Sequence, residues 1–306
     1  MTQVSLEVDV GGGLKLRNPV IAASGTFGYG VEYAGVTDPS QLGAVVVKGL
    51  SLTPSRGHPA PRLTETPCGV LNAIGLQNIG IDAFLREKLP ELSRCGVTVV
   101  VNCWGTTVEE YGEVVAALGA SPGVGAIELN ISSPNKREWG RIIATDPVRT
   151  AEVIRAARLN TKLPLWVKLS PNVTDIAEFA RLAEDAGADT LCVANTYVGM
   201  AVDLRSRKPV LSNVTGGLSG PAIKPLSLRA VYEVVRAVRI PVIGVGGISS
   251  GRDALEYLLV GARAVQIGTA NLYDPGTGLK VIRQITDFLA TEGLGDVNQF
   301  IGTLRS

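Results

Sequence analysis

The run Val99-Val100-Val101-Asn102 ends abruptly on an amide, and four similar runs end on a lysine or an asparagine. They are Val45-Val46-Val47-Lys48, Ile127-Glu128-Leu129-Asn130, Leu165-Trp166-Val167-Lys168 and Leu191-Cys192-Val193-Ala194-Asn195. Short apolar runs of this kind are typical of parallel strands that are buried on both faces. An amide or ammonium adds nothing to packing at a C-terminal strand tip, but in an α/β barrel the chemistry lies at that tip. The repeated pattern therefore predicts an enzyme with one central polar pocket.

Strands and helices are expected to alternate along almost the whole chain. The strands are predicted near residues 19–23, 44–48, 98–102, 126–130, 165–168, 190–194, 242–245 and 264–267. The helices are predicted near residues 79–93, 107–118, 147–160, 175–187, 226–238, 251–260 and 278–292. This alternation predicts an α/β protein in which eight parallel strands close into a (β/α)8 barrel, or TIM barrel. Because such barrels commonly reach this length as one domain, residues 1–306 are assigned to a single domain.

Two additions to the barrel are expected. An N-terminal β-hairpin, Ser5–Asp9 and Leu14–Leu16 around Gly11-Gly12-Gly13, would cap the bottom of the barrel. The connections 49–78 and 196–225 follow predicted strand tips and are each about thirty residues long, a length typical of functional loops. Both are expected to fold as long loops over the C-terminal mouth of the barrel.

The composition excludes several classes of partner. Lys and Arg number 29 and Asp and Glu 28, so a net charge of +1 gives no electrostatic case for nucleic acid or an anionic membrane. No apolar run approaches the roughly 18 residues of a transmembrane helix, and the N-terminus lacks the layout of a signal peptide. The four cysteines show no spacing suited to a metal, so no metal site is predicted. A cytoplasmic protein with reduced thiols is expected.

Glycines follow the last two predicted strands, at Gly246-Gly247 and at Gly268-Thr269. Bare glycines let backbone N–H groups and a helix N-terminus close on a phosphate. Either pair alone would also suit a simple turn. Together, after the last two strands of a barrel, they predict a site for a phosphorylated ligand or flavin mononucleotide (FMN).

The chain resembles the dihydroorotate dehydrogenase family, flavin enzymes of pyrimidine synthesis, over nearly its whole length. The motifs that carry the resemblance occur in the same order: Ala23-Ser24-Gly25, Lys48-Gly49, Leu71 to Asn78, Asn102, Asn130 with Ser132–Asn135, Lys168, Ala194-Asn195-Thr196, Gly217-Leu218-Ser219-Gly220, Gly246-Gly247 and Gly268-Thr269. The resemblance implies oxidation of (S)-dihydroorotate to orotate, with a proton leaving C5 and a hydride passing from C6 to FMN.

Within this family, the segment Asn72–Asn78 is similar to the NAD-linked type. That type implies a heterotetramer, in which a homodimer of FMN subunits is joined by two subunits that carry FAD and a 2Fe-2S cluster. The chain has no cysteine cluster for iron–sulfur and no GxGxxG motif that opens a βαβ unit. Electrons are therefore expected to leave through a partner subunit or to pass directly to a small acceptor such as fumarate.

The resemblance implies that Ser133 is the base that removes the C5 proton. Soluble members usually have cysteine at this position, whereas quinone-linked members have serine. A thiol has a pKa of about 8.5, but a serine hydroxyl is far less acidic and needs a relay, such as a water chain or a neighbouring hydroxyl. The sequence leaves open whether Ser133 is native or substituted.

The resemblance also implies roles for the side chains at the strand tips. Lys48 is expected to pair with charge on the substrate or flavin and to take part in catalysis, and Lys168 to stabilise the reduced flavin at its pyrimidine edge. The asparagines offer both donors and acceptors to a ring edged with amides. The residues expected to bind substrate are Lys48, Asn72, Ala73, Ile74, Gly75, Leu76, Asn130, Asn195 and Thr196. Those expected to bind FMN are Ser24, Lys48, Gly49, Asn102, Asn130, Lys168, Ala194, Gly220, Gly246, Gly247, Gly268 and Thr269.

Two other classes of protein fit part of the pattern. A buried lysine at a strand tip could form a Schiff base in a phosphate-binding aldolase or isomerase, although such an enzyme would also need a carboxylate at the mouth. A flavin- or ligand-binding barrel without activity would share the fold but would not turn over substrate. A flavin spectrum would exclude the aldolase, and turnover would exclude the inactive barrel.

Overall fold

The computed structural model describes residues 4–133 and 143–305, and a closed barrel of eight parallel strands forms its centre. The strands succeed one another around the barrel in chain order. They are β3 (Val20–Ala22), β4 (Ala44–Leu50), β7 (Val99–Cys103), β8 (Ala126–Asn130), β9 (Leu165–Lys168), β10 (Thr190–Val193), β15 (Val242–Val245) and β16 (Ala264–Ile267). The predicted (β/α)8 barrel is confirmed. Pro134 and Asn135 of the resemblance lie outside the described residues.

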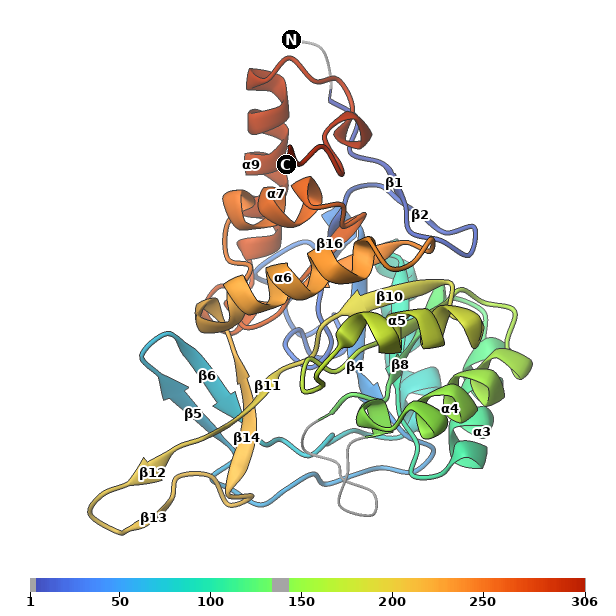
Figure 1. Ribbon diagram of the computed structural model, residues 1–306. Coiled ribbons are helices and arrows are strands. Elements are labelled where there is room, and N and C mark those ends of the chain that lie inside the picture. Colours follow the sequence, from blue (N-terminus) through green and yellow to red (C-terminus); the bar gives the residue numbers. More distant parts are fainter. Residues whose placement is uncertain (1–3, 134–142, 306) are drawn as a thin grey trace.

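Helices surround the barrel and connect its strands (Figure 1). The longer ones are α3 (Val108–Gly119), α4 (Pro147–Leu159), α5 (Ile176–Asp185), α6 (Lys224–Val235), α7 (Gly251–Leu259) and α9 (Thr277–Thr291). The helix predicted at 79–93 is divided into α1 (Ile81–Ala83), a π-helical turn (Phe84–Lys88) and α2 (Leu89–Cys95). A short helix that was not predicted, α8 (Ala270–Tyr273), follows β16 directly. None of the described helices is long and apolar enough to cross a membrane.

The N-terminal hairpin is shorter than predicted. Its strands are β1 (Val8–Asp9) and β2 (Lys15–Leu16), because Ser5 pairs instead with the C-terminal segment, donating its N–H to the carbonyl of Gly295 at 2.9 Å. The hairpin contacts the N-terminal ends of the barrel strands, where the Thr190 hydroxyl donates to the carbonyl of Val10. It therefore covers the bottom of the barrel, as expected.

The two long connections lie at the barrel mouth as predicted, and they also pair with each other, which was not predicted. They form an antiparallel sheet in the order β11 (Tyr197–Met200), β14 (Thr215–Ser219), β6 (Gly69–Asn72) and β5 (Leu63–Thr66). A further hairpin, β12 (Val202–Asp203) and β13 (Lys208–Pro209), projects from this sheet (Figure 1). The central pair joins residues far apart in sequence, with Asn72 opposite Gly217. The sheet lies beside the C-terminal barrel mouth and forms one wall of the cavity there.

Candidate active site

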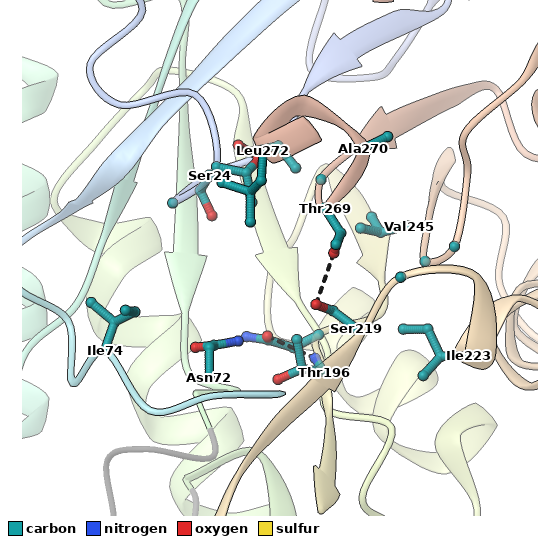
Figure 2. Close-up of a pocket in the computed structure, with 18 of the residues that line it drawn as sticks. Ser24, Asn72, Ile74, Thr196, Ser219, Ile223, Val245, Thr269, Ala270 and Leu272 are labelled. Carbon is teal, nitrogen blue, oxygen red and sulfur yellow. Dashed lines mark hydrogen bonds between the residues drawn. The ribbon is translucent and has the colours of Figure 1, made fainter. Parts of the chain in front are cut away.

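A cavity of about 560 Å³ opens at the C-terminal ends of the barrel strands, a size typical of ligand pockets. It brings together almost all the predicted site residues: Ser24, Lys48, Gly49, Asn72, Ile74, Gly75, Leu76, Asn102, Asn130, Ser133, Lys168, Ala194, Asn195, Thr196, Gly220, Gly246, Gly247, Gly268 and Thr269. Figure 2 shows Asn72 and Thr196 on one side of this cavity and Ser24 and Leu272 on the other.

Ala73 is the exception among the predicted substrate-binding residues. It does not line the cavity, and its side chain is buried in a small apolar cluster with Leu71 and Leu211 behind the sheet. Its backbone holds two parts of the 49–78 connection together, since its N–H donates to the carbonyl of Arg62 at 2.8 Å. The side chain of Ala73 therefore does not face the cavity, and a direct role of this residue in substrate binding stays a prediction.

The glycines after β15 and β16 form a recess with little side-chain bulk. Gly246 and Gly247 have positive φ angles of 135° and 66°, which side chains rarely adopt. A Cβ atom on Gly247 would lie 2.6 Å from the Cβ atom of Lys224, so there is no room for one. Beside the recess, the Thr269 hydroxyl donates to Ser219 Oγ at 2.8 Å (Figure 2). The recess suits a phosphate group approached by backbone N–H groups.

A buried cation lies at the tip of β9. Lys168 Nζ is 3.1 Å from Gln266 Oε1 and 3.7 Å from Glu128 Oε1, and all three side chains are buried. Glu128 also accepts hydrogen bonds of 2.6 Å from Asn102 Nδ2 and of 2.6 Å from Gln266 Nε2. The ammonium group of Lys168 therefore belongs to a polar network inside the barrel, placed to stabilise negative charge at the cavity floor.

Asn130 presents an unused acceptor. Its Nδ2 donates to Asn102 Oδ1 at 3.2 Å, and its backbone carbonyl accepts from the Tyr111 hydroxyl at 2.9 Å. Its Oδ1 is buried and has no hydrogen-bond partner among the described residues. A buried acceptor without a partner costs about 1–3 kcal/mol, so this atom suits a ligand that supplies a donor.

Three further polar residues of the cavity lie in the segments that follow β8 and β10: Ser133, Asn195 and Thr196. Ser133 is buried and lines the cavity. Its neighbour Ser132 accepts a hydrogen bond from Asn195 Nδ2 at 2.9 Å, which joins the two segments. The Thr196 carbonyl accepts from Asn172 Nδ2 at 3.0 Å, so Asn172 supports this wall from the loop after β9.

Lys48 lines the opposite part of the site without an ion-pair partner among the described residues. Burial lowers the pKa of Lys48, the positive charge of Arg62 lowers it further, and Glu32 opposes these effects. An ammonium group in this setting is destabilised until an anion approaches it. It therefore suits a carboxylate on a ligand.

The comparisons with known proteins decide the family. A family model described as dihydroorotate dehydrogenase matches residues 5–291. The chain belongs to the dihydroorotate dehydrogenase family. Three relatives carry the name dihydroorotate dehydrogenase B (NAD(+)), catalytic subunit. The protein of Geobacter sp. (strain M21) is 54% identical over 96% of both chains, and those of Geotalea daltonii and Geobacter sulfurreducens are each 52% identical over the full length of both chains.

Membership of the dihydroorotate dehydrogenase family removes the support for the aldolase alternative. Neither Glu128 nor Gln266 was among the predicted site residues. Glu128 lies two residues before Asn130 on the same strand, so strand periodicity places both side chains on the interior face. That periodicity was the available signal for Glu128; its contact with Gln266 was not visible in the sequence.

Proposed function

We propose that this chain is the FMN-binding catalytic subunit of an NAD-linked dihydroorotate dehydrogenase, which oxidises (S)-dihydroorotate to orotate in pyrimidine biosynthesis. Family membership and the names of its full-length relatives support this function. The structural observation that carries it is one cavity with a glycine-lined recess after β15 and β16 and a buried lysine on its floor. This combination suits a ligand that has both a phosphate and a ring that gains negative charge on reduction.

The residues fit FMN at both ends. Gly246, Gly247, Gly268 and Thr269 would hold the phosphate, because all four line the cavity and the three glycines leave their backbone N–H groups uncovered by side chains. Lys168 and Asn102 would hold the ring at the cavity floor, with Ser24, Gly49, Ala194 and Gly220 along its length. When bound, FMN supplies the acceptor for the hydride from C6.

Dihydroorotate fits the remainder of the cavity. Lys48 would pair with its carboxylate, because this ammonium group has no ion-pair partner among the described residues. Asn72, Asn130 and Asn195 would bind the amide edge of the ring, and Asn130 Oδ1 is the buried acceptor that such an edge can satisfy. Thr196 and the segment 74–76 would complete the walls. This arrangement would orient the substrate and exclude water from its reacting face.

Ser133 would hold the base position opposite C5. Its hydroxyl oxygen would take the C5 proton while its own hydroxyl proton passes to a water or a neighbouring hydroxyl, because an alkoxide is too basic to persist at neutral pH. Ser132 is directly beside it and is anchored by Asn195, which fixes the start of this segment.

The electrons would pass to NAD through a partner subunit that carries FAD and a 2Fe-2S cluster. Among the described residues, no group of three or more His, Cys, Asp or Glu side chains could hold a metal, and the four cysteines are not bonded to one another. The proposed assembly is a homodimer of this chain within a heterotetramer, located in the cytoplasm. The alternative is a chain that reduces fumarate or another small acceptor without a partner.

The deciding experiment is an absorbance spectrum of the purified chain before and after anaerobic addition of dihydroorotate. The proposal predicts a flavin spectrum that bleaches on addition of dihydroorotate, with orotate formed in equal amount. A colourless protein that cannot be loaded with FMN would contradict the cofactor assignment. A flavin spectrum that does not bleach would leave a binding protein, and turnover of this chain alone with fumarate would favour the partner-free alternative.

A further inference from the structure

A carboxylate lies inside the barrel, one layer of side chains below the cavity. Glu128 is on β8, and its side chain is fully buried. Burial of a charged carboxylate costs several kcal/mol unless its oxygens are paired. Here Oε1 accepts from Asn102 Nδ2 and Oε2 accepts from Gln266 Nε2, both at 2.6 Å, and Lys168 Nζ is 3.7 Å from Oε1. Every polar group that faces this side chain in these contacts is a donor, which suits an ionised carboxylate.

The carboxylate determines the direction of the hydrogen bonds toward Asn130. An ionised carboxylate only accepts, so Asn102 has to turn its Nδ2 toward Glu128. The Oδ1 of Asn102 then faces Asn130 and accepts from its Nδ2 at 3.2 Å. Asn130 Oδ1 is consequently the atom left without a partner among the described residues. The acceptor character of this end of the site therefore follows from the charge on Glu128.

The same carboxylate determines the direction of the bonds toward Lys168. Gln266 turns its Nε2 toward Glu128, so its Oε1 is free to accept from Lys168 Nζ at 3.1 Å. Glu128 thus holds the ammonium group through Gln266. Its own negative charge, 3.7 Å from Nζ, offsets part of the positive potential that Lys168 creates at the cavity floor.

We propose that Glu128 is a positioning residue of this active site. It presents Asn130 Oδ1 to the ligand as an acceptor, and it holds Lys168 in place while limiting the positive potential that acts on the flavin. The inference rests on the proposed function, because Asn130 and Lys168 are the residues assigned there to substrate and FMN.

The variant Glu128→Gln tests both effects. A glutamine has one acceptor where glutamate has two, so it can satisfy Asn102 or Gln266 in their present orientations, but not both. Loss of the negative charge is expected to raise the FMN reduction potential by about 30 mV, which corresponds to a tenfold change in the two-electron equilibrium. Orotate affinity, followed by the change it causes in the flavin spectrum, is expected to fall about tenfold.

The swap Glu128→Gln with Gln266→Glu is the rescue variant. The glutamate at 266 would accept from Lys168 and from the new amide at 128, and the oxygen of that amide would still accept from Asn102. One charge and the hydrogen bonds that hold Asn102 and Lys168 are retained, so the reduction potential and the orotate affinity are expected to return to within about twofold of the parent equilibria. If the single variant does not fold, the double variant still tests the proposal. A reduction potential and an orotate affinity equal to those of the parent support the proposal, and equilibria that differ tenfold from the parent contradict it.

The packing control is Val100→Ala. Val100 is buried on β7, two residues before Asn102, and its side chain has no polar atom that could join the hydrogen bonds around Glu128. Its potential and orotate affinity are expected to stay at the parent values. Unchanged values in Glu128→Gln, or the same changes in Val100→Ala, would overturn the inference. If the parent protein binds FMN and oxidises dihydroorotate in the same assays, the proposed function stands and only the inference about Glu128 is contradicted.

Discussion

Removal of the Lys168 side chain is expected to destabilise the folded protein even before FMN binds. Lys168 and Glu128 are both buried, with Nζ and Oε1 3.7 Å apart. At an effective dielectric constant of about 20, two unit charges at this distance attract by about 4–5 kcal/mol. The desolvation of both groups offsets most of this attraction, so the intact pair adds little net stability. Removing one partner is different, because the other charge then stays buried without compensation.

The variant Lys168→Met is therefore expected to lose about 3–5 kcal/mol of unfolding free energy in the FMN-free protein. The double variant Lys168→Met with Glu128→Gln removes both charges, and it is expected to recover most of this loss. Urea denaturation of the FMN-free parent, the two single variants and the double variant measures the coupling directly. Strictly additive losses would refute the reasoning, because they would mean that the two charges do not compensate each other. A Lys168→Met loss below about 1 kcal/mol would refute it as well.

Further predictions concern FMN binding, proton removal, pH dependence and electron transfer. Gly247→Asp is expected to abolish FMN retention, because its side chain would meet Lys224 and its charge would repel the phosphate. Equilibrium dialysis measures FMN retention, and retention equal to that of the parent would show that the phosphate binds elsewhere. Ser133→Ala is expected to retain FMN but to slow flavin reduction by dihydroorotate about 10²–10⁴-fold, whereas Ser133→Cys should move the rise in rate to lower pH. Stopped-flow reduction across pH tests both, and equal rates for Ser and Ala would place the base elsewhere. Burial lowers the pKa of Lys48, so orotate affinity should fall as pH rises through that lowered pKa, and Lys48→Arg should hold affinity to higher pH in the same titration. NAD reduction is expected only with the FAD- and iron–sulfur-bearing subunit present, and robust NAD reduction by the isolated chain in a steady-state assay would contradict this.

The barrel and most of its cavity could be predicted because their signals are local. Each buried strand is a short apolar run, and each functional tip, such as Lys48, Asn102 or Lys168, ends such a run. The order of strands in a (β/α)8 barrel follows the order of the chain, so all the tips meet at one mouth once the fold class is known. The same logic placed the glycines after β15 and β16 at that mouth, where they line the cavity.

The sheet beside the mouth could not be predicted in the same way. Its central strands, β6 and β14, bring Asn72 opposite Gly217, and neither strand shows a clear alternation of apolar and polar residues. Pairing between such distant segments depends on how the barrel holds their ends. The position of the Ala73 side chain has the same origin, because it packs with Leu71 and Leu211 and not into the cavity.

Apolar periodicity and strand ends are local properties of a chain, so the eight-stranded barrel, the glycines after its last two strands and the identity of the polar strand tips could be predicted without the structure. Which of these side chains touch one another depends on how the barrel closes. Gln266 donates to Glu128, which lies 138 positions earlier in the sequence. Lys168, at the end of β9, donates to Gln266. Closing the barrel excludes water from its interior, so each buried polar group there has to find its partner on another strand, and the charge on Glu128 sets which partner is donor and which is acceptor.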